Sequence, residues 1–490
     1  MFRPDCTLYP DTERNMQTTH SRWNPTTMMA TMATMATMAT MVAAVLLGLP
    51  TPTAQAARAD HDVAAIADAM VASINDLRTL AALATAGDER VATTARTRLR
   101  AAGPAGLAAF LALHGDAIAA ATNLSPGTAT KVARSQLLAS LDEICGQRDC
   151  AATQLYWYTD LEQAKKAARA SGRPILSLRL LGDLREQLSC ANSRLFRALL
   201  YPDPAVATLL RARFVLHWHS ERPAPKITID LGDGRTIEST ITGNSVHDVL
   251  DREGRVVDAL PGLATPAAFI AGLERAAGLA ITTVDLEPAA RTRALRDHHA
   301  RRLVELDLAW DRELRAIGQR SRQLPQRPQV ADRPRAGNAA MIAPTKSSIE
   351  VGMLAALGEP VTPLTDTEVF DRLADRHSAE VQLSNPALAR LASQQWRSGD
   401  PTRDAADFAV ATERLRRDLA LDTLRNEFDL HRSIHQWFAE TTGPLELEAL
   451  NLRIYDELFL TPRSDPWLGL AAPTIHGGLD GGGRHVQARL

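Results

Sequence analysis

The residues best suited to covalent chemistry in this sequence are its cysteines. There are four, and Cys6 falls in an N-terminal stretch that we expect to be removed. Cys145 and Cys150 flank a turn-forming Gly-Gln-Arg-Asp, which makes them candidates for a disulfide. Such a bridge closes a short loop and contributes about 2 kcal/mol. It leaves Cys190 as a free thiol, and the alternative is three unpaired, buried cysteines.

Other motifs that carry chemistry are weak or absent. The sequence contains no Cys-x-x-Cys pair, haem-attachment motif, phosphate-binding loop, Gly-x-Ser-x-Gly elbow or dinucleotide fingerprint. His431 and His435 stand four residues apart but lack the glutamate of a His-Glu-x-x-His zinc motif. We therefore interpret them as core or interface histidines, and we expect no metal and no cofactor.

The composition is that of a folded protein close to neutrality. The chain has 490 residues, of which 45% are hydrophobic and 23% charged, and its net charge is −2. These values exclude a mainly disordered chain and give no global field that would attract nucleic acid. Aromatic residues make up only 4%, which favours helices packed through Ala and Leu over an all-β protein.

The first 56 residues resemble a secretory signal peptide. A Met-Ala-Thr repeat leads into an apolar run that ends at Pro50, and Ala54-Gln55-Ala56 fits a small-x-small cleavage pattern. The apolar run is too short to span a bilayer well, and the alternative is a disordered tail. We predict cleavage after Ala56, a periplasmic or secreted mature chain, and no membrane span once the leader is gone.

Three stretches of the sequence carry the apolar periodicity of helices. They are residues 57–150, 281–320 and 346–470. The Pro-, Gln- and Arg-rich residues 321–345 are expected to form a linker or long loop, and the glycine-rich residues 471–490 a disordered tail.

The intervening residues 151–280 alternate strands and helices. Strands are indicated at 174–181 and 214–219, with a helix between them that begins at Cys190. Two glycine-containing turns, at 232–234 and 252–254, each join a pair of short strands. This pattern predicts an α/β domain between helical regions.

Several short motifs in residues 151–280 occur in an order known from one superfamily. They are Ala164-Lys165, Gly172-Arg-Pro-Ile-Leu176, Cys190-Ala-Asn-Ser193, Asp203-Pro-Ala-Val206, Leu210 and Phe214-Val215. With this order and spacing, the region resembles thioredoxin-like proteins. The resemblance implies an α/β thioredoxin-like central domain flanked by mainly α-helical N- and C-terminal regions.

The resemblance also implies roles for individual residues. Cys190 takes the position of the nucleophilic thiol, at a helix N-terminus where the dipole favours the thiolate. Ser193 takes the position of the resolving cysteine, so monothiol exchange is the chemistry that remains. Where thioredoxins place a cis-proline facing the thiol, this sequence has residues 243–245, Gly-Asn-Ser. The long loop 182–189 is positioned to cover the thiol.

Three histidines are brought near the thiol by the same arrangement. A strand 214–219 running parallel to 174–181 directs His219 toward Cys190, where its imidazole would lower the pKa of the thiol. Cys190, His217 and His219 as a metal-binding set is one alternative, and ordinary hydrogen-bonded histidines is another. His247 follows the Gly-Asn-Ser segment and is a further neighbour of the thiol.

Two functions follow from these residues. The first is monothiol disulfide exchange, with Cys190, Ser193 and His219 as the catalytic set and a thiol or disulfide as substrate. The second is a non-enzymatic protein-binding or assembly module on a repurposed thioredoxin scaffold, which presents loops 182–189 and 221–243 to a protein partner. Neither involves nucleic acid.

Overall fold

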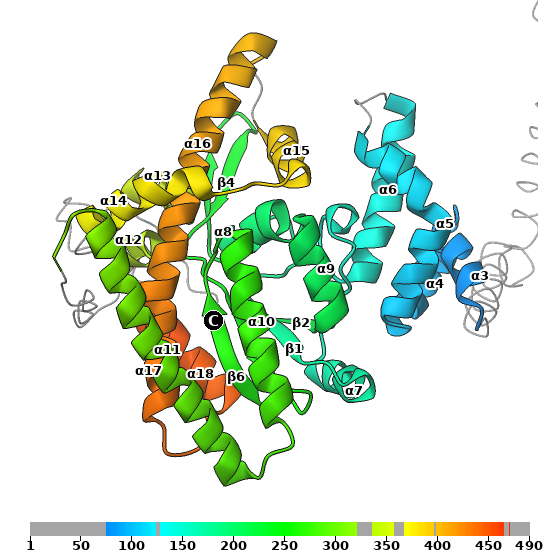
Figure 1. Ribbon diagram of the computed structural model, residues 1–490. Coiled ribbons are helices and arrows are strands. Elements are labelled where there is room, and N and C mark those ends of the chain that lie inside the picture. The colour runs from blue at the N-terminus through cyan, green and yellow to red at the C-terminus, as the bar shows by residue number, and fades with distance from the viewer. Residues whose placement is uncertain are drawn as a thin grey trace, which may run out of the picture. The chain divides into compact units, whose positions relative to one another are not determined.

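The computed structural model describes residues 75–123, 128–320, 336–356, 367–395, 398–464 and 470. These residues form a mixed α/β protein in which helices surround a small central sheet (Figure 1). The expected leader 1–56 with its cleavage position, the expected tail 471–490 and residues 321–335 of the expected linker lie outside the described residues.

The described residues of the N-terminal region form four α-helices, as the periodicity predicts. They are α3 (Leu77–Leu83), α4 (Glu89–Ala101), α5 (Pro104–Asn123) and α6 (Thr128–Cys145). The chain turns between α4 and α5 at Gly103, whose φ of +70° is accessible to glycine at little cost. A Cβ on Gly106 would lie 1.9 Å from the Leu99 carbonyl oxygen, so a glycine is needed where these two helices meet.

One of these helices also has a composition suited to a membrane. Among the described residues, Pro104–Thr122 is the single helix long and apolar enough to cross a bilayer, and 28% of its most apolar window is buried inside the protein. Length and composition of this kind also occur in the core helices of soluble proteins.

The central sheet has four strands. They are β1 (Ile175–Leu181), β2 (Val215–Arg222), β5 (Val246–Leu250) and β6 (Val256–Pro261). The order across the sheet is β2-β1-β5-β6. β1 runs parallel to β2, with Ile175 opposite Val215, and antiparallel to β5, whose hairpin continues into β6. The parallel pairing of the two predicted strands is thus confirmed.

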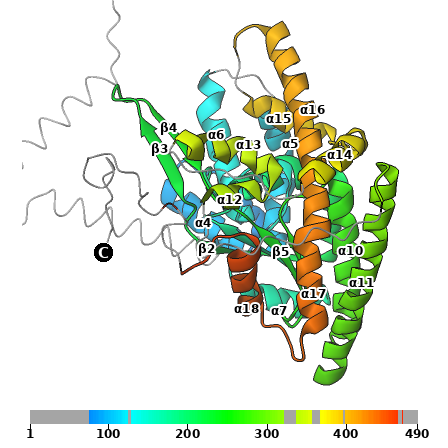
Figure 2. The same cartoon turned by 90° about the vertical axis from the view of Figure 1, so that its left-hand side faces the viewer.

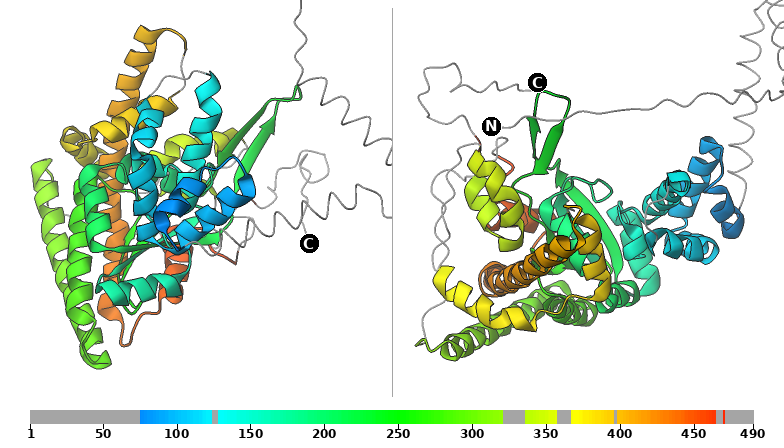
Figure 3. Two further views of the ribbon diagram at one scale, coloured as in Figure 1. Left: turned by 90° about the vertical axis from the view of Figure 1, so that its right-hand side faces the viewer. Right: turned by 90° about the horizontal axis from the view of Figure 1, so that it is seen from above.

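A separate hairpin is inserted between β2 and β5. Its strands, β3 (Lys226–Asp230) and β4 (Thr236–Thr240), form a two-stranded sheet of their own. Gly232 and Gly234 in the turn have φ values of +76° and +87°, which explains the Gly-Asp-Gly sequence. The hairpin stands away from the central strands (Figures 2 and 3).

Helices lie before, between and after these strands. They are α7 (Leu161–Ser171), α8 (Ala191–Leu195) with its π-helical continuation η2 (Phe196–Leu200), α9 (Pro204–Arg213) and α10 (Pro266–Thr283). The Asp160 side chain caps α7 by accepting from the Gln163 N–H, and Gly172 ends α7 in the left-handed conformation. Thr265 caps α10 in the same way as Asp160 caps α7.

The C-terminal part of the described chain is helical. Its helices are α11 (Pro288–Ala316), α12 (Ala336–Met341), α13 (Pro344–Ala356), α14 (Thr367–His377), α15 (Asn385–Gln394), α16 (Pro401–Arg425), α17 (Arg432–Glu440) and α18 (Leu447–Arg453). π-Helical segments follow α16 and α18, at η4 (Asn426–His431) and η5 (Ile454–Leu458). The interval expected to be a linker is therefore helical over α12 and the start of α13.

Candidate functional site

Cys190 lies where the chain leaves β1 and starts α8. Its backbone N–H donates to the Leu181 carbonyl at 3.0 Å, which ties the cysteine to the end of β1. The residue is the N-cap of α8, so its position at a helix start agrees with the prediction. Its side chain is 0% exposed, and the thiol therefore does not reach the surface.

Two hydroxyl groups contact the sulfur of Cys190. The Sγ atom lies 3.0 Å from Ser245 Oγ and 3.4 Å from Ser193 Oγ. Ser193 Oγ itself lies 2.8 Å from Ser189 Oγ and 2.9 Å from the Cys190 carbonyl oxygen. The thiol thus belongs to a buried network of hydroxyl groups that includes Ser193.

Residues 243–245, expected opposite the thiol, do face it. Ser245 contacts the sulfur, and a Cβ added at Gly243 would lie 2.3 Å from Cys190 Cβ, well inside any real contact. Glycine is therefore the residue that allows this segment to approach the start of α8 so closely.

Helix α13 covers the same segment through a buried carboxylate. Glu350 accepts hydrogen bonds from the backbone N–H groups of Thr242 and Gly243, each at 3.1 Å. Lys346 Nζ donates to Glu350 at 3.3 Å and to the Ala339 carbonyl at 2.8 Å. Both charged side chains are 0% exposed, and burial raises the pKa of Glu350 despite the ammonium beside it.

The surroundings of the Cys190 thiol, formed by the start of α8 and residues 242–245 and covered by α13, are called the thiol face below. This thiol face also contains buried polar groups that lack partners among the described residues. The side-chain amides of Asn192 and Asn244 are fully buried, and none of their oxygen and nitrogen atoms has a hydrogen-bond partner among the described residues. Tyr455 from η5 donates its hydroxyl to the Asn244 backbone carbonyl at 3.2 Å, which adds a second cover. Leaving a buried polar group unpaired costs about 1–3 kcal/mol. Apolar side chains would fill this interior at lower cost, so packing alone does not explain the two amides.

Two of the three histidines of the central sheet form hydrogen bonds away from the thiol, and the third is exposed. His217 Nδ1 lies 2.9 Å from Ser177 Oγ, and burial with nearby Arg179 lowers the His217 pKa to about 3. His247 Nε2 lies 2.7 Å from the Tyr201 hydroxyl, and burial lowers its pKa to about 3. His219 is exposed, in the middle of β2. The hydroxyl partners of the thiol, and not His219, are the groups found at hydrogen-bonding distance from the sulfur among the described residues.

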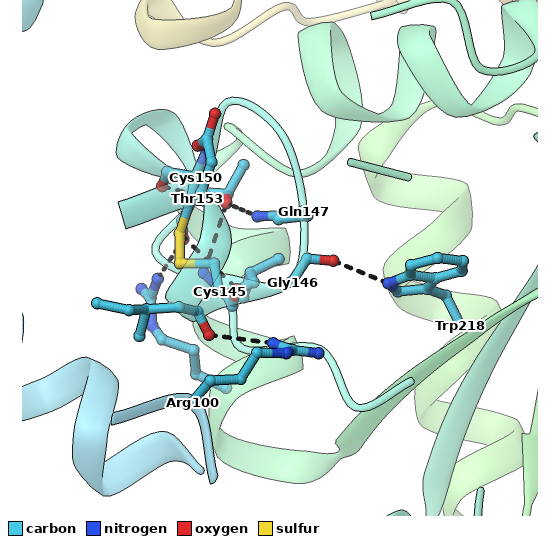
Figure 4. Close-up of a disulfide and its surroundings, with 11 residues drawn as sticks. Arg100, Cys145, Gly146, Gln147, Cys150, Thr153 and Trp218 are labelled. Carbon is cyan, nitrogen blue, oxygen red and sulfur yellow. Dashed lines mark hydrogen bonds between the residues drawn. A yellow bond between two sulfur atoms is a disulfide. The ribbon is translucent and has the colours of Figure 1, made fainter. Parts of the chain in front are cut away.

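The predicted disulfide is present. Cys145 and Cys150 are bonded, and the loop between them is held from two sides (Figure 4). Trp218 Nε1 donates to the Gly146 carbonyl at 2.8 Å, and Arg100 donates to the Ile144 carbonyl at 3.1 Å. These two hydrogen bonds connect the end of α6 and the bridged loop to α4 and to strand β2.

An ionic group that the sequence did not indicate, centred on the buried Arg179, connects the sheet to α18. Arg179 on β1 is 1% exposed and pairs with Glu221 at 3.0 Å and with Glu448 at 2.7 Å. Asp248 lies 3.6 Å from the same guanidinium, and burial raises its pKa to about 7. No motif marks these residues, because each comes from a different element.

One cluster has the spacing of metal ligands. Asp258, His299 and His435 each offer an atom within 4.8 Å of the others, whereas Cys190, His217 and His219 do not form such a group among the described residues. Burial lowers the His299 pKa to about 4. Although burial opposes it, neighbouring His431 holds the pKa of Asp258 well below its usual range.

No protein-family model, curated protein or solved structure matches this chain. The function is therefore inferred from the geometry of its own sites.

Proposed function

We propose that this protein is a binding or assembly module on a thioredoxin-like scaffold, and that its β3–β4 hairpin is the surface it presents to a protein partner. The observation that carries the proposal is an exposed apolar pair. Ile229 and Ile237 stand directly opposite each other in the hairpin and are 37% and 51% exposed.

The strand arrangement supports the scaffold part of this proposal. A parallel β1–β2 pair joined through helices, followed by an antiparallel β5–β6 hairpin in the order β2-β1-β5-β6, fits the element order from which the resemblance was drawn. Tyr158, just before α7, forms an isolated parallel bridge to His217 on β2, which places a further extended segment beside that strand.

The closure of the thiol face favours binding over catalysis. Glu350 takes up the backbone N–H groups beside the thiol, and Cys190 is 0% exposed. A thiol exchanging with a disulfide must be reached by a second sulfur along a defined line of attack. With α13 and Tyr455 in place, that approach is closed.

The hairpin has one apolar and one polar face. Side chains on directly opposed residues share a face, so Ile227 with Ser239 and Ile229 with Ile237 form one face. Leu231, 47% exposed, continues the alternation at the turn. The other face is formed by Lys226, Thr228, Asp230, Thr236, Glu238 and Thr240.

The apolar face is continuous with a buried cluster at the base of the hairpin. Ile227 packs there against Ile241, which is 1% exposed, and the face then extends outward through Ile229 and Ile237. An isolated two-stranded hairpin is marginally stable in water. A protein partner that covers the outer isoleucines with an apolar surface would therefore both bind the hairpin and stabilise it.

Site-specific photo-crosslinking in the full chain tests this assignment. A photoreactive side chain at position 237 should give one defined adduct, whereas the same group at Thr228 on the polar face should not. The adduct should disappear in Ile229→Ser at unchanged thermal stability. Equal adducts from both positions, or an adduct insensitive to Ile229→Ser, would show that the apolar face is not the docking surface. An adduct of twice the chain mass would identify the partner as a second copy.

Monothiol exchange is the second candidate, and one observation favours it. Cys190 caps a helix within a polar interior where Asn192 and Asn244 have unpaired amides, as expected of a site that closes over a ligand. The alkylation rate of Cys190 against pH in the native chain decides the matter. A rate already at its plateau near pH 7 would support an activated thiolate. Reaction only after unfolding would eliminate thiol exchange.

A further inference from the structure

A second buried polar cluster shares no residue with the thiol face or the hairpin. Asp258 lies on the edge strand β6, His299 on α11 and His435 on α17, and they are 3%, 0% and 2% exposed. α11 and α17 run side by side (Figure 1). Residues from three distant parts of the chain therefore meet in one buried site.

The tautomer of His299 follows from its hydrogen bonds. Its Nε2 lies 2.9 Å from the Val257 backbone carbonyl, which only accepts, so Nε2 carries the hydrogen. In the neutral imidazole, Nδ1 then presents a bare lone pair. That lone pair faces His435 Nδ1 at 2.7 Å.

Two of the three residues, His299 and Asp258, have the outer hydrogen bonds that metal ligands usually have. Ligating histidines donate their second ring N–H to a carbonyl or carboxylate, and ligating carboxylates are themselves hydrogen-bonded. His299 donates in this way to Val257, and His431 Nε2 lies 2.8 Å from Asp258 Oδ1. Both ligand types are therefore already oriented from outside the cluster.

His435 supplies a further observation. If the two Nδ1 atoms share a hydrogen, that hydrogen sits on His435, and its Nε2 becomes a bare lone pair. This Nε2 is buried and has no hydrogen-bond partner among the described residues. A cation between the two Nδ1 atoms removes the need for a shared hydrogen, so that each ring can keep its hydrogen on Nε2 and turn an Nδ1 lone pair toward the ion.

We propose that Asp258, His299 and His435 bind one divalent first-row transition ion of the zinc type. Two imidazole nitrogens and one carboxylate suit such an ion better than Mg²⁺ or Ca²⁺, which prefer oxygen ligands. Two nitrogens on a tetrahedral zinc lie about 3.3 Å apart, so the rings need only separate slightly from 2.7 Å. The ion would fasten α11 and α17 to β6.

Direct titration of the untagged full chain with Co²⁺ tests the site. Cobalt bound to imidazole and carboxylate gives visible absorption bands that saturate at one equivalent, and Zn²⁺ should abolish them by displacement. Mg²⁺ and Ca²⁺ should leave the bands unchanged. The native protein should also melt at a higher temperature with Zn²⁺ than with Mg²⁺.

Matched variants locate the ion. His435→Gln and His299→Gln should each abolish the one-equivalent absorption, whereas His298→Gln, next to His299 but outside the ligand set, should retain it. His431→Gln keeps all three ligands but removes the hydrogen bond to Asp258 and the ring contact with His435, so it should weaken cobalt affinity by about 10–100-fold.

Two results would overturn the proposal. A native chain without saturable visible bands and without a zinc-dependent melting shift would make the cluster a hydrogen-bonded histidine pair in a core. Bands that persist unchanged in folded His435→Gln would place the cobalt elsewhere. The native titration decides the first question even where a variant fails to fold.

Discussion

The thiol face and the β3–β4 hairpin depart from the usual distribution of polar and apolar groups in opposite directions. At the thiol face, Lys346 and Glu350 are fully buried, together with the amides of Asn192 and Asn244. On the hairpin, the Ile229–Ile237 pair is exposed. Burying polar groups and exposing apolar ones both cost stability unless something compensates.

The difference lies in where the compensation comes from. The thiol face is closed by this chain itself, because α13 supplies the carboxylate that accepts from Thr242 and Gly243. The hairpin's outer isoleucines receive no such cover from the described residues. Changes at the thiol face should therefore cost folding stability, whereas changes on the hairpin should cost binding alone.

The largest expected effect is at Glu350. Replacing it by Ala leaves the buried Lys346 ammonium unpaired and removes the acceptor of two backbone N–H groups. Breaking a buried ion pair from one side costs about 3–5 kcal/mol. We expect a loss of that size in the free energy of unfolding, measured with urea, together with faster alkylation of Cys190.

A double variant serves as the control. Lys346→Met with Glu350→Met removes both charges, so it should lose less stability than Glu350→Ala, because no buried charge is left unpaired. Equal losses in the two variants would mean that the ion pair is not what holds α13 over the thiol face.

The next largest effect is expected at Gly243. An added Cβ would lie 2.3 Å from Cys190 Cβ, so Gly243→Ala forces the segment away from α8. Overpacking of this kind costs about 1–3 kcal/mol. Gly278→Ala, inside α10 with nothing within 4 Å of the new Cβ, is the control and should be neutral or stabilising. Thermal melts of both variants compare them, and similar melting temperatures would contradict the close approach.

Features that depend only on residues close together in the chain, such as helix caps and a local disulfide, could be predicted from the sequence. Asp160 and Gly172 bound α7 through local capping, and the Cys145–Cys150 pair spans a single turn. The cover of the thiol face was not predictable, because Glu350 is 107 residues from Gly243 and no motif links them. α12 was missed because its short Ala-rich sequence follows a Pro- and Arg-rich stretch that reads as a loop.

The metal-like cluster illustrates the same limit. His431 and His435 were interpreted as core histidines because the sequence shows only their own spacing. Asp258 and His299 come from a strand and a helix that contact α17 only after folding. Residue types at local spacing identify a ligand pair on one helix, but a set assembled by tertiary packing has no sequence signature.

The pH dependence of folding stability provides a test whose expected effect is of intermediate size. Burial lowers the pKa of His247, on β5 next to the thiol face, from 6.5 to about 3. A histidine with a depressed folded pKa contributes stability that is complete above pH 6.5 and is lost as the pH falls toward 3. Replacing His247 by Gln should therefore reduce the stability lost between pH 6 and pH 4 by about 1–2 kcal/mol.

The carboxyl group of neighbouring Asp248 contributes to stability with the opposite pH dependence. Burial raises the pKa of Asp248 from 3.8 to about 7, so its contribution is complete below pH 3.8 and is lost as the pH rises toward 7. Asp248→Asn should therefore flatten the decline toward neutral pH and leave the acid loss in place. Urea midpoints measured from pH 4 to pH 7 separate the two, and parallel profiles for all variants would contradict this assignment.

The hairpin residues 226–240 contain no histidine, so crosslinking at position 237 should not follow this acid profile.

The smallest effect on stability is expected on the hairpin. Ile229→Thr with Ile237→Thr keeps β-branched residues on both strands and removes an apolar pair that water already reaches. A cross-strand pair contributes about 0.2–1 kcal/mol, so the double variant should stay within about 1 kcal/mol of the original chain in urea unfolding.

Ile241→Thr, at the buried base and 1% exposed, is the matched control and should lose about 2 kcal/mol or more. If the double variant lost as much as the control, the outer isoleucines would be part of this chain's own core. If it kept its stability while the adduct from a photoreactive group at Leu231 disappeared, the apolar face would be serving recognition alone.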